Sequence, residues 1–543
     1  MLLSLAAKPA PPTIASRLET VGDRRHGLPL WSPGDLGLAN GTNVADTSLR
    51  NMDTRKAAEK ALSIPLDGLP ILISDRALEN SKSALSRLAD LTARPSHNIS
   101  FETITMPKRK FGHRPILIPD APARVFYSAL VESIEKDLEP DSRGPWTWAT
   151  HVNFAANSPS EYIVDIDIAA CYEFIDHERL HEELLMRTMD VSKADAIASF
   201  LGRCSFKGRG IPQLSSPSDR LADLYLSILQ RQLMRHALEV SRYADDFRVR
   251  ANDWDSANEV IEFAAEYARE LGLILSSDKT KITRTENYRA QVQAQKDLRD
   301  KYLDSARASL TVVELVSRKY EDLGVVEIPP DDQEAVAASM RQIITDWHGI
   351  AAGASPESES GSEVVLRKMV PAAITLLMKK ERIEEGVFTD LVYREPIRLA
   401  SVCKYILGRL SSFDEAKENW SLLRKIIESG RIGPWARIWL LHVVGALEDL
   451  PSDDANWVIT WAGNQCNDRH ETVRAEAAWA CAKFGRLTNE MVTTLLKAST
   501  TLTQHGISAA MGRQGDLNAA LVKSVVQERA PINREAHDWG KVN

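Results

Sequence analysis

A short strand with acids on one face constrains the fold of this chain more than any other feature. Residues 162–168 read Tyr-Ile-Val-Asp-Ile-Asp-Ile. The two-residue period of a strand places Asp165 and Asp167 on one face and the apolar even-numbered residues on the other. Two carboxylates on one strand repel each other and are costly to desolvate unless cations neutralise them. The strand therefore predicts a sheet with a polar face where positive charge gathers.

A second acid pair lies downstream, in Arg242-Tyr-Ala-Asp-Asp-Phe247. Adjacent aspartates between apolar residues suit the turn of a β-hairpin, from which Asp245 and Asp246 project toward a shared metal. Alone, this string also fits a surface turn. Together with the strand it predicts phosphoryl transfer, in which two cations about 3.5–4 Å apart clamp the attacking and leaving oxygens. Oxygen ligands select Mg²⁺, with Mn²⁺ as a substitute.

The chain has 543 residues, which is too long for one core and predicts two to four domains. From 104 to 284 short β-type runs alternate with helices, an α+β pattern. Helices are predicted at 81–92, at 218–233 with Ser216 or Ser218 as N-cap, and from a capping box at Ser256 and Glu259 to a stop at Gly272.

No strand is expected beyond about residue 290. Two linkers are predicted, at 328–332 and 354–363. Apolar helices then begin near Arg398, Arg437 and Arg474, at spacings of 39 and 37 residues. A period near forty resembles HEAT-like helical repeats, with the arginines bridging neighbouring repeats, while an irregular helical domain is the alternative.

Composition limits where nucleic acid could bind. The net charge is −8, so a nucleic-acid site must be local, and one local basic run holds Lys108, Arg109, Lys110 and Arg114. The five cysteines include no CxxC pair, which argues for a reducing compartment. We find no signal peptide and no apolar run of spanning length, and therefore expect a cytoplasmic protein without a membrane partner.

Five blocks in order now suggest a family. They are Met106–Pro119, Asp167–His177, Gly210–Gln213 continuing to Leu226, Tyr243–Asp246, and Leu271–Lys281. Together they resemble the reverse transcriptases, most closely the bacterial lineage that includes the group II intron enzymes. The blocks cover about 104 to 284, and their order is far more specific than any single block. The resemblance implies an upstream fingers segment and a ferredoxin-like palm.

The resemblance also implies roles for individual residues. Asp167, Asp245 and Asp246 would be catalytic metal ligands, with Ile168 contributing to the metal site. Lys279 would be the general acid for pyrophosphate, and the nucleotide-binding residues would be Lys108 and Arg114 on the triphosphate, Tyr172 as the steric gate against a 2′-hydroxyl, and Gln213 at template or nucleotide. Asp165 stays open between metal support and a strand-edge charge. Asp176 and His177 are interpreted as capping the next helix.

At three places the sequence differs from the usual motifs of the reverse transcriptases. Leu214 replaces the glycine that usually follows Pro-Gln, Ser218-Asp219 replaces a Ser-Pro pair, and no primer-grip string follows Thr283. The bulkier residue at 214 puts ordinary templated synthesis in doubt. A core of this kind followed by a long helical region looks like the abortive-infection and defence-associated (unknown-group) reverse transcriptases of bacteria, some of which start DNA on a protein tyrosine.

We therefore predict an RNA-directed or template-independent DNA polymerase of anti-phage defence. Its partners would be dNTPs and RNA or DNA; a homo-oligomer and a phage-derived trigger are left open. Candidate priming tyrosines are Tyr302, Tyr320, Tyr393 and Tyr405. The rivals are a templated intron- or retron-like enzyme, a disfavoured RNA-dependent RNA polymerase, and a non-catalytic phage-sensing scaffold with a vestigial palm.

The predicted organisation has five parts. They are an N-terminal extension (1–100), fingers (101–160), a catalytic palm (161–290), a helical connector with linkers (291–363), and an α-helical repeat-like domain (364–543).

Overall fold

The structure is a computed structural model, and it describes residues 52–108, 112–205, 207–304, 315–319, 322–325, 333–353, 361–377, 383–409, 413–429, 432–526 and 531–543. The first half of the predicted N-terminal extension lies outside these residues. So do Arg109 and Lys110, the first predicted linker, and most of the second. None of the described helices is both long and apolar enough to cross a membrane.

The segment before the palm consists of helices around one hairpin. Its elements are α2 (Thr54–Ser63), α3 (Ile73–Arg76), α4 (Lys82–Thr92), β1 (Phe101–Pro107), β2 (His113–Pro119), α5 (Ala121–Glu132), η1 (Glu135–Asp137) and α6 (Pro145–Ala156). The helix predicted at 81–92 is confirmed as α4. Strands β1 and β2 pair antiparallel with Met106 opposite Arg114, which makes the hairpin of the predicted fingers.

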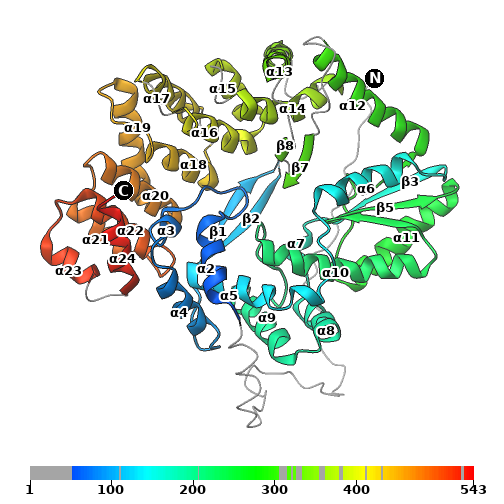
Figure 1. Cartoon of the computed structure of the whole chain (residues 1–543), viewed down its shortest axis with the longest axis horizontal. Helices are drawn as coiled ribbons and strands as arrows, with labels where there is room; N and C mark the ends of the chain where they lie inside the picture. The colour runs from blue at the N-terminus through cyan, green and yellow to red at the C-terminus, as the bar shows by residue number, and fades with distance from the viewer. Residues whose placement is uncertain are drawn as a thin grey trace, which may run out of the picture. The chain divides into compact units, whose positions relative to one another are not determined.

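The palm is a four-stranded antiparallel sheet in the order β4-β5-β3-β6. Figure 1 labels two of these strands, β3 and β5, with α11 beside them. Its strands are β3 (Tyr162–Asp167), β4 (Val240–Tyr243), β5 (Asp246–Ala251) and β6 (Lys281–Arg284), and its helices are α7 (Cys171–Phe174), α8 (His177–Thr188), α9 (Val191–Cys204), α10 (Ser216–Arg235) and α11 (Trp254–Glu270). Helices connect β3 to β4 and β5 to β6. This order and connection are those of a ferredoxin-like fold, so the predicted α+β palm is confirmed.

Two predicted helix starts were wrong by a few residues. The N-cap of α10 is Ser215, not Ser216 or Ser218, and the Ser218 hydroxyl pairs with Tyr127 instead. The capping box of α11 joins Asp253 and Ser256, not Ser256 and Glu259. Aspartate is a strong N-cap acceptor, so the helix begins one turn earlier.

The predicted absence of strands beyond residue 290 was also wrong. After the long helix α12 (Thr285–Asp304), β7 (Leu315–Lys319) and β8 (Asp322–Val325) form an antiparallel hairpin. The strands have only five and four residues, LVSRK and DLGV. The first lacks the two-residue alternation by which a strand is predicted, and the second is too short to establish it. Helix α6 lies beside β7, and α14 lies beside β8.

All the regular elements described after β8 are helices. The helices are α13 (Gln333–Gly353), α14 (Gly361–Leu377), α15 (Glu385–Arg394), η3 (Pro396–Arg398), α16 (Leu399–Leu407), α17 (Phe413–Glu428), α18 (Pro434–Val444), α19 (Asp453–Asn464), η4 (Gln465–Asn467), α20 (Glu471–Lys483), α21 (Asn489–Lys497), α22 (Gln504–Gln514), α23 (Ala519–Val526) and α24 (Pro531–Gly540). The even-numbered helices from α14 to α24 contact one another in succession, and the odd-numbered ones from α13 to α19 do the same (Figure 1). The result is two stacked rows of helices.

The three arginines that marked the predicted repeats have different partners. Arg437 of α18 pairs with Asp468, which precedes α20. Arg474 of α20 donates to the carbonyl of Ala498, beyond α21. Arg398 instead pairs with Glu395 within its own turn. Two of the three therefore connect successive helices, as the predicted structural role requires, whereas the repeat itself stays a prediction.

The helical rows are attached to the segment that precedes the palm by tryptophan side chains. The ring nitrogens of Trp435 and Trp439, both on α18, donate to the carbonyl of Gly68 at 2.6 and 2.9 Å. Trp435 is fully buried. Helix α18 also contacts strand β1. The fingers hairpin therefore rests on a helix more than 300 residues further along the chain.

A carboxylate of the fingers also caps a distant helix. Glu102 of β1 accepts hydrogen bonds from the backbone of Glu471 and Thr472, at 2.9 and 3.0 Å, and pairs with the ring of His470. These are the first amides of α20, and the side chain of its N-cap residue, His470, does not itself cap the helix. A negative charge at a helix N-terminus is favourable, so strand β1 supplies the missing cap.

Candidate active site

The acidic hairpin predicted from the sequence is present between β4 and β5. Tyr243 pairs with Asp246, so Ala244 and Asp245 alone form the turn. Ala244 has φ 53°, in the left-handed region that allows a two-residue reversal but is strained for alanine. Its amide donates to the hydroxyl of Ser142 at 3.1 Å. A contact from outside the sheet therefore stabilises the turn.

Sheet register brings the three predicted acids together. Asp167, the last residue of β3, lies directly opposite Asp246 on β5. Desolvation by the surrounding protein, and then the charges of Asp245 and Asp167, raise the pKa of Asp246 to about 7. Part of the Asp246 side chain nevertheless remains exposed. Burial and the charge of Asp167 also raise the pKa of Asp245. The carboxylates repel one another, as acids do when they lack a neutralising cation.

Lys279 supplies a positive charge at this place. Its Nζ lies 2.9 Å from Oδ1 of Asp167. Burial disfavours the charged ammonium, but the hydrogen bond to Asp167 and the nearby carboxylates raise the pKa of Lys279 overall. The side chain is 68% exposed, so the ammonium can move away without disturbing the core. The structure thus places Lys279 beside the acids; its role as a general acid stays a prediction.

A divalent cation suits these acids chemically, although the structure does not hold them in a finished coordination geometry. Within the ranges that the structure describes, no three His, Cys, Asp or Glu side chains form a ready-made ion site. The donors are all oxygens, which Mg²⁺ prefers, and a cation would relieve the repulsion that raises their pKa values. Ile168 forms an isolated bridge with Leu275 whose hydrogen bonds use Asp167 and Ala169, so neither bond occupies the Ile168 carbonyl.

The two predicted triphosphate ligands come from the fingers hairpin. Arg114 is buried opposite Met106, and Lys108 follows at the end of β1. Burial, together with the charges of Arg114 and Lys279, lowers the pKa of Lys108, while Glu173 and Asp245 act in the opposite direction. Lys108 therefore lies within electrostatic reach of Arg114, Lys279 and Asp245. Through Lys108, a cation of the fingers lies close enough to feel the charge of a palm acid, Asp245.

The loop that carries Gln213 is hydrogen-bonded to helix α7, which carries Tyr172. The amide of Ile211 donates to the Tyr172 carbonyl at 2.8 Å, and Gln213 Nε2 donates to Glu173 at 3.4 Å. Gly210 has φ 90°, and a β-carbon there would approach the Glu173 carbonyl to 3.3 Å, so this close packing requires glycine. Both predicted nucleotide contacts are buried, and their contact with substrate stays a prediction.

The neighbouring acids and histidine have structural partners. Asp165 accepts from Arg248 Nε at 2.9 Å, which favours the interpretation of a strand charge neutralised by the adjacent strand. Asp176 caps α8 by accepting from the amide of Arg179, as predicted. The capping interpretation was wrong for His177, which is the first residue of α8 and pairs through its ring with the carbonyl of Gly210, so that it holds the loop that carries Gln213.

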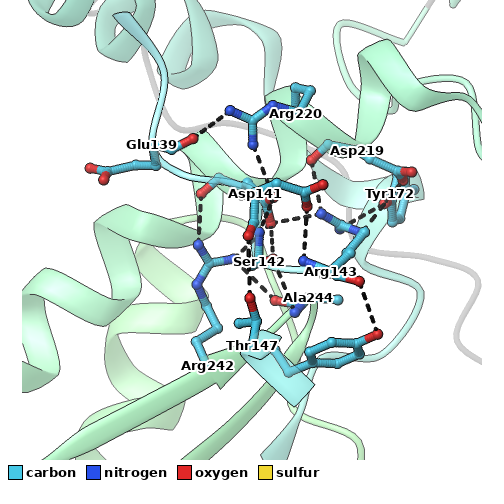
Figure 2. A network of polar contacts seen from close by, with 12 residues as sticks. Glu139, Asp141, Ser142, Arg143, Thr147, Tyr172, Asp219, Arg220, Arg242 and Ala244 are labelled. Atoms are coloured by element: carbon cyan, nitrogen blue, oxygen red, sulfur yellow. Dashed lines mark hydrogen bonds and ion pairs between the residues drawn. The ribbon is translucent and has the colours of Figure 1, made fainter. Parts of the chain in front are cut away.

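A network around Arg143 was not predicted (Figure 2). Its guanidinium lies 2.8 Å from Asp223 and 3.0 Å from the Tyr172 hydroxyl, and also pairs with Asp219. Burial disfavours the charge of Asp223, yet Arg143 and Arg242 hold its pKa below the usual value. The signal in the sequence was the pair Asp219 and Asp223, four residues apart on an apolar helix, where like charges destabilise unless a cation lies between them.

The departure at Leu214 has a structural explanation. Its φ is 61°, the left-handed value that the usual glycine would adopt freely. The side chain is 2% exposed within the core beside Met106 and Leu69, and its carbonyl accepts from Asp67. The chain therefore keeps a glycine-like backbone and adds a buried side chain beneath the fingers.

We expect Leu214→Gly and Leu214→Ala both to destabilise the protein, the alanine variant more. Each loses about 2–5 kcal/mol of burial, but only glycine recovers about 1 kcal/mol of backbone strain. Denaturant unfolding of both variants and the wild type measures the difference. A glycine variant less stable than the alanine variant would contradict the left-handed backbone at this position.

The site so described has acids on a ferredoxin-like sheet, cations on a preceding hairpin and a buried aromatic residue on α7, a set of side chains suited to nucleotidyl transfer. Residues 106–324 match the family model described as Reverse transcriptase (RNA-dependent DNA polymerase). The match begins within β1 and ends within β8. No curated protein shows a significant match to the chain. The match identifies this segment as a reverse transcriptase domain, the domain of an RNA-directed DNA polymerase, in agreement with the motifs of the sequence.

Proposed function

We propose that the protein is a metal-dependent DNA polymerase of bacterial anti-phage defence, acting by abortive infection and starting synthesis on a protein tyrosine. The observation that carries the polymerase is the register of the palm, which sets Asp167 opposite Asp246 beside the turn of Asp245. The match to the reverse transcriptase family supports it. The defence role rests on the resemblance to abortive-infection and defence-associated enzymes, with group II intron enzymes as the nearest lineage for the palm.

In this proposal Asp167, Asp245, Asp246 and the carbonyl of Ile168 hold two Mg²⁺ ions, for which Mn²⁺ can substitute. When bound, such ions activate the attacking hydroxyl and neutralise the leaving pyrophosphate.

The side chains of the protein do the remaining work. Arg114 binds the triphosphate with its planar guanidinium, and Lys108 adds a point charge. Lys279 releases Asp167 and donates a proton to the leaving pyrophosphate oxygen. Tyr172 excludes a ribose 2′-hydroxyl, and Gln213 orients the template or the incoming nucleotide. Positioned charge is the main requirement of such a transfer.

The helical region would serve recognition. Two stacked rows are the packing of paired-helix repeats, and we propose that they form a HEAT-like solenoid that binds a phage-derived trigger. The five domain boundaries predicted from the sequence belong to this proposal, as does a cytoplasmic location. Of the candidate priming tyrosines, Tyr393 is half exposed, whereas Tyr405 is buried and accepts from the amide of Ile383. Tyr320 and the side chain of Tyr302 lie outside the described residues.

Purified protein supplied with dNTPs and Mg²⁺ is expected to produce DNA that is covalently attached to it. Labelled product should migrate with the protein, shift after proteinase treatment, and disappear when EDTA removes the metal. Product that is resistant to proteinase treatment would leave the polymerase in place but exclude protein priming. No product with either metal, with and without an RNA template and primer, would contradict the polymerase itself.

One observation favours a second candidate, a templated enzyme of intron or retron type. Such an enzyme needs a hairpin that grips the primer, and β7 and β8 follow the palm with β7 beside α6. Incorporation that depends on an annealed RNA template and primer would favour this candidate over protein priming.

A further inference from the structure

The hydroxyl of Tyr172 lies in a polar network that a purely apolar gate would not need (Figure 2). Tyr172 is 4% exposed on α7, five residues after Asp167. Its hydroxyl donates to Asp219 of α10 and accepts from Arg143 Nη2 at 3.0 Å. Two charged partners on two different segments therefore hold one ring.

Arg143 connects this ring to the helix behind it. Its Nη1 lies 2.8 Å from Asp223, and it also donates to the carbonyl of Asp219 at 3.2 Å. Both acids belong to α10, and Asp223 is fully buried. An arginine fork that binds two acids of one helix has little freedom to move. The position of the Tyr172 hydroxyl is therefore set by the body of the palm.

The same loop holds the turn that carries Asp245. The Ser142 hydroxyl donates to Asp223 at 2.5 Å and accepts from the amide of Ala244 at 3.1 Å. The carbonyl of Arg143 accepts from Tyr243. Residues 142 and 143 therefore hold both the Tyr172 ring and the turn that carries Asp245.

We propose that Asp219 and Arg143 are positioning residues that lock the Tyr172 ring and thereby set the discrimination between deoxyribonucleotides and ribonucleotides. The inference rests on the proposed function, in which this ring excludes the 2′-hydroxyl. Steric exclusion requires a wall that does not yield, because a ring that can tilt admits the larger sugar. Neither positioning residue touches the nucleotide in this proposal.

The hydrogen bonds that join the Tyr172 hydroxyl to Asp219 and Arg143 are called the tether below. Tyr172→Phe tests the tether because it removes the hydroxyl and leaves the ring. We expect the preference for a deoxynucleotide over the matching ribonucleotide, measured as the ratio of their kcat/KM values, to fall about tenfold. Asp219→Ala should lower the preference similarly, whereas Asp219→Asn, which keeps an acceptor oxygen, should largely restore it. Because both changes break one contact, their effects on the preference should not add in the Tyr172→Phe/Asp219→Ala double variant.

Tyr127→Phe is the matched control. Tyr127 is another buried tyrosine, and its hydroxyl pairs with Ser218, the residue next to Asp219, at 2.9 Å. Its loss should lower the melting temperature about as much as Tyr172→Phe does and leave the sugar preference unchanged. An equal fall in preference in both variants would overturn the tether.

Tyr172→Val removes the ring itself. This variant distinguishes a failure of the tether from a failure of the proposed role of Tyr172 as a gate against the 2′-hydroxyl. If the valine variant loses the preference and the phenylalanine variant keeps it, the gate stands and the tether is overturned. If the valine variant keeps the preference, the ring excludes nothing and the inference falls with the gate. A wild-type protein that incorporates neither nucleotide overturns the proposed function and this inference together.

Discussion

Replacing Asp245 by alanine is expected to lower nucleotide incorporation by roughly 10³-fold or more and to leave the fold intact. Asp245 stands at the tip of the β4–β5 hairpin beside Asp167 and Asp246. In the proposed mechanism its carboxylate has no substitute. Its removal also relieves repulsion, because the charge of Asp245 helps to raise the pKa of Asp246. Incorporation kinetics and thermal unfolding of the same preparation measure both effects.

Asp165→Asn is the control for this prediction. Asp165 lies on the same strand as Asp167, but its partner is Arg248 rather than the acid cluster. We expect this variant to retain incorporation within a few-fold and to lose some stability. Equal loss of incorporation in both variants would mean that any acid on the sheet is needed for folding, and incorporation by Asp245→Ala at the wild-type rate would eliminate the metal-ion mechanism.

Trp435→Ala is expected to cost about 3–5 kcal/mol of unfolding free energy, the largest stability effect that we predict. The side chain is fully buried on α18 and donates to the carbonyl of Gly68 at 2.6 Å. Alanine would leave a cavity at the point where α18 meets the segment before the fingers. Trp439 would keep its own bond to the same carbonyl, so the loss is chiefly one of packing.

Trp146→Ala serves as the comparison, because Trp146 is 85% exposed and should change stability by less than about 0.5 kcal/mol. Both variants are measured by denaturant unfolding with the same probe. A small effect of Trp435→Ala would mean that α18 does not hold the fingers segment, and the contacts of Gly68 would then be incidental to stability.

Much of the palm could be predicted from the sequence because its information is local. The alternation of residues 162–168 fixed the strand and its acidic face, and the two-residue turn at Ala244 and Asp245 fixed the hairpin. That the strand and the hairpin lie side by side could then be predicted, because their carboxylates would otherwise lack a cation to neutralise them. The motif blocks added the fingers hairpin, whose Lys108 lies within electrostatic range of Asp245.

What escaped prediction depends on contacts between distant segments. Nothing near Glu102 in the sequence indicates that it caps α20, and nothing near Gly68 indicates two tryptophan donors. Arg143 was missed for the same reason, although Asp219 and Asp223 were a usable sign of a buried cation. The β7–β8 hairpin was missed because strands of four or five residues carry too little pattern.

Because Glu102 of β1 caps α20, the stability of the fingers hairpin and the stability of the helical rows depend on each other. A fragment ending after the palm would leave Glu102 without the amides it accepts from and would uncover the apolar surface that Trp435 now seals. We therefore expect a fragment that contains only the fingers and palm to be less stable than the 543-residue chain, which retains these contacts.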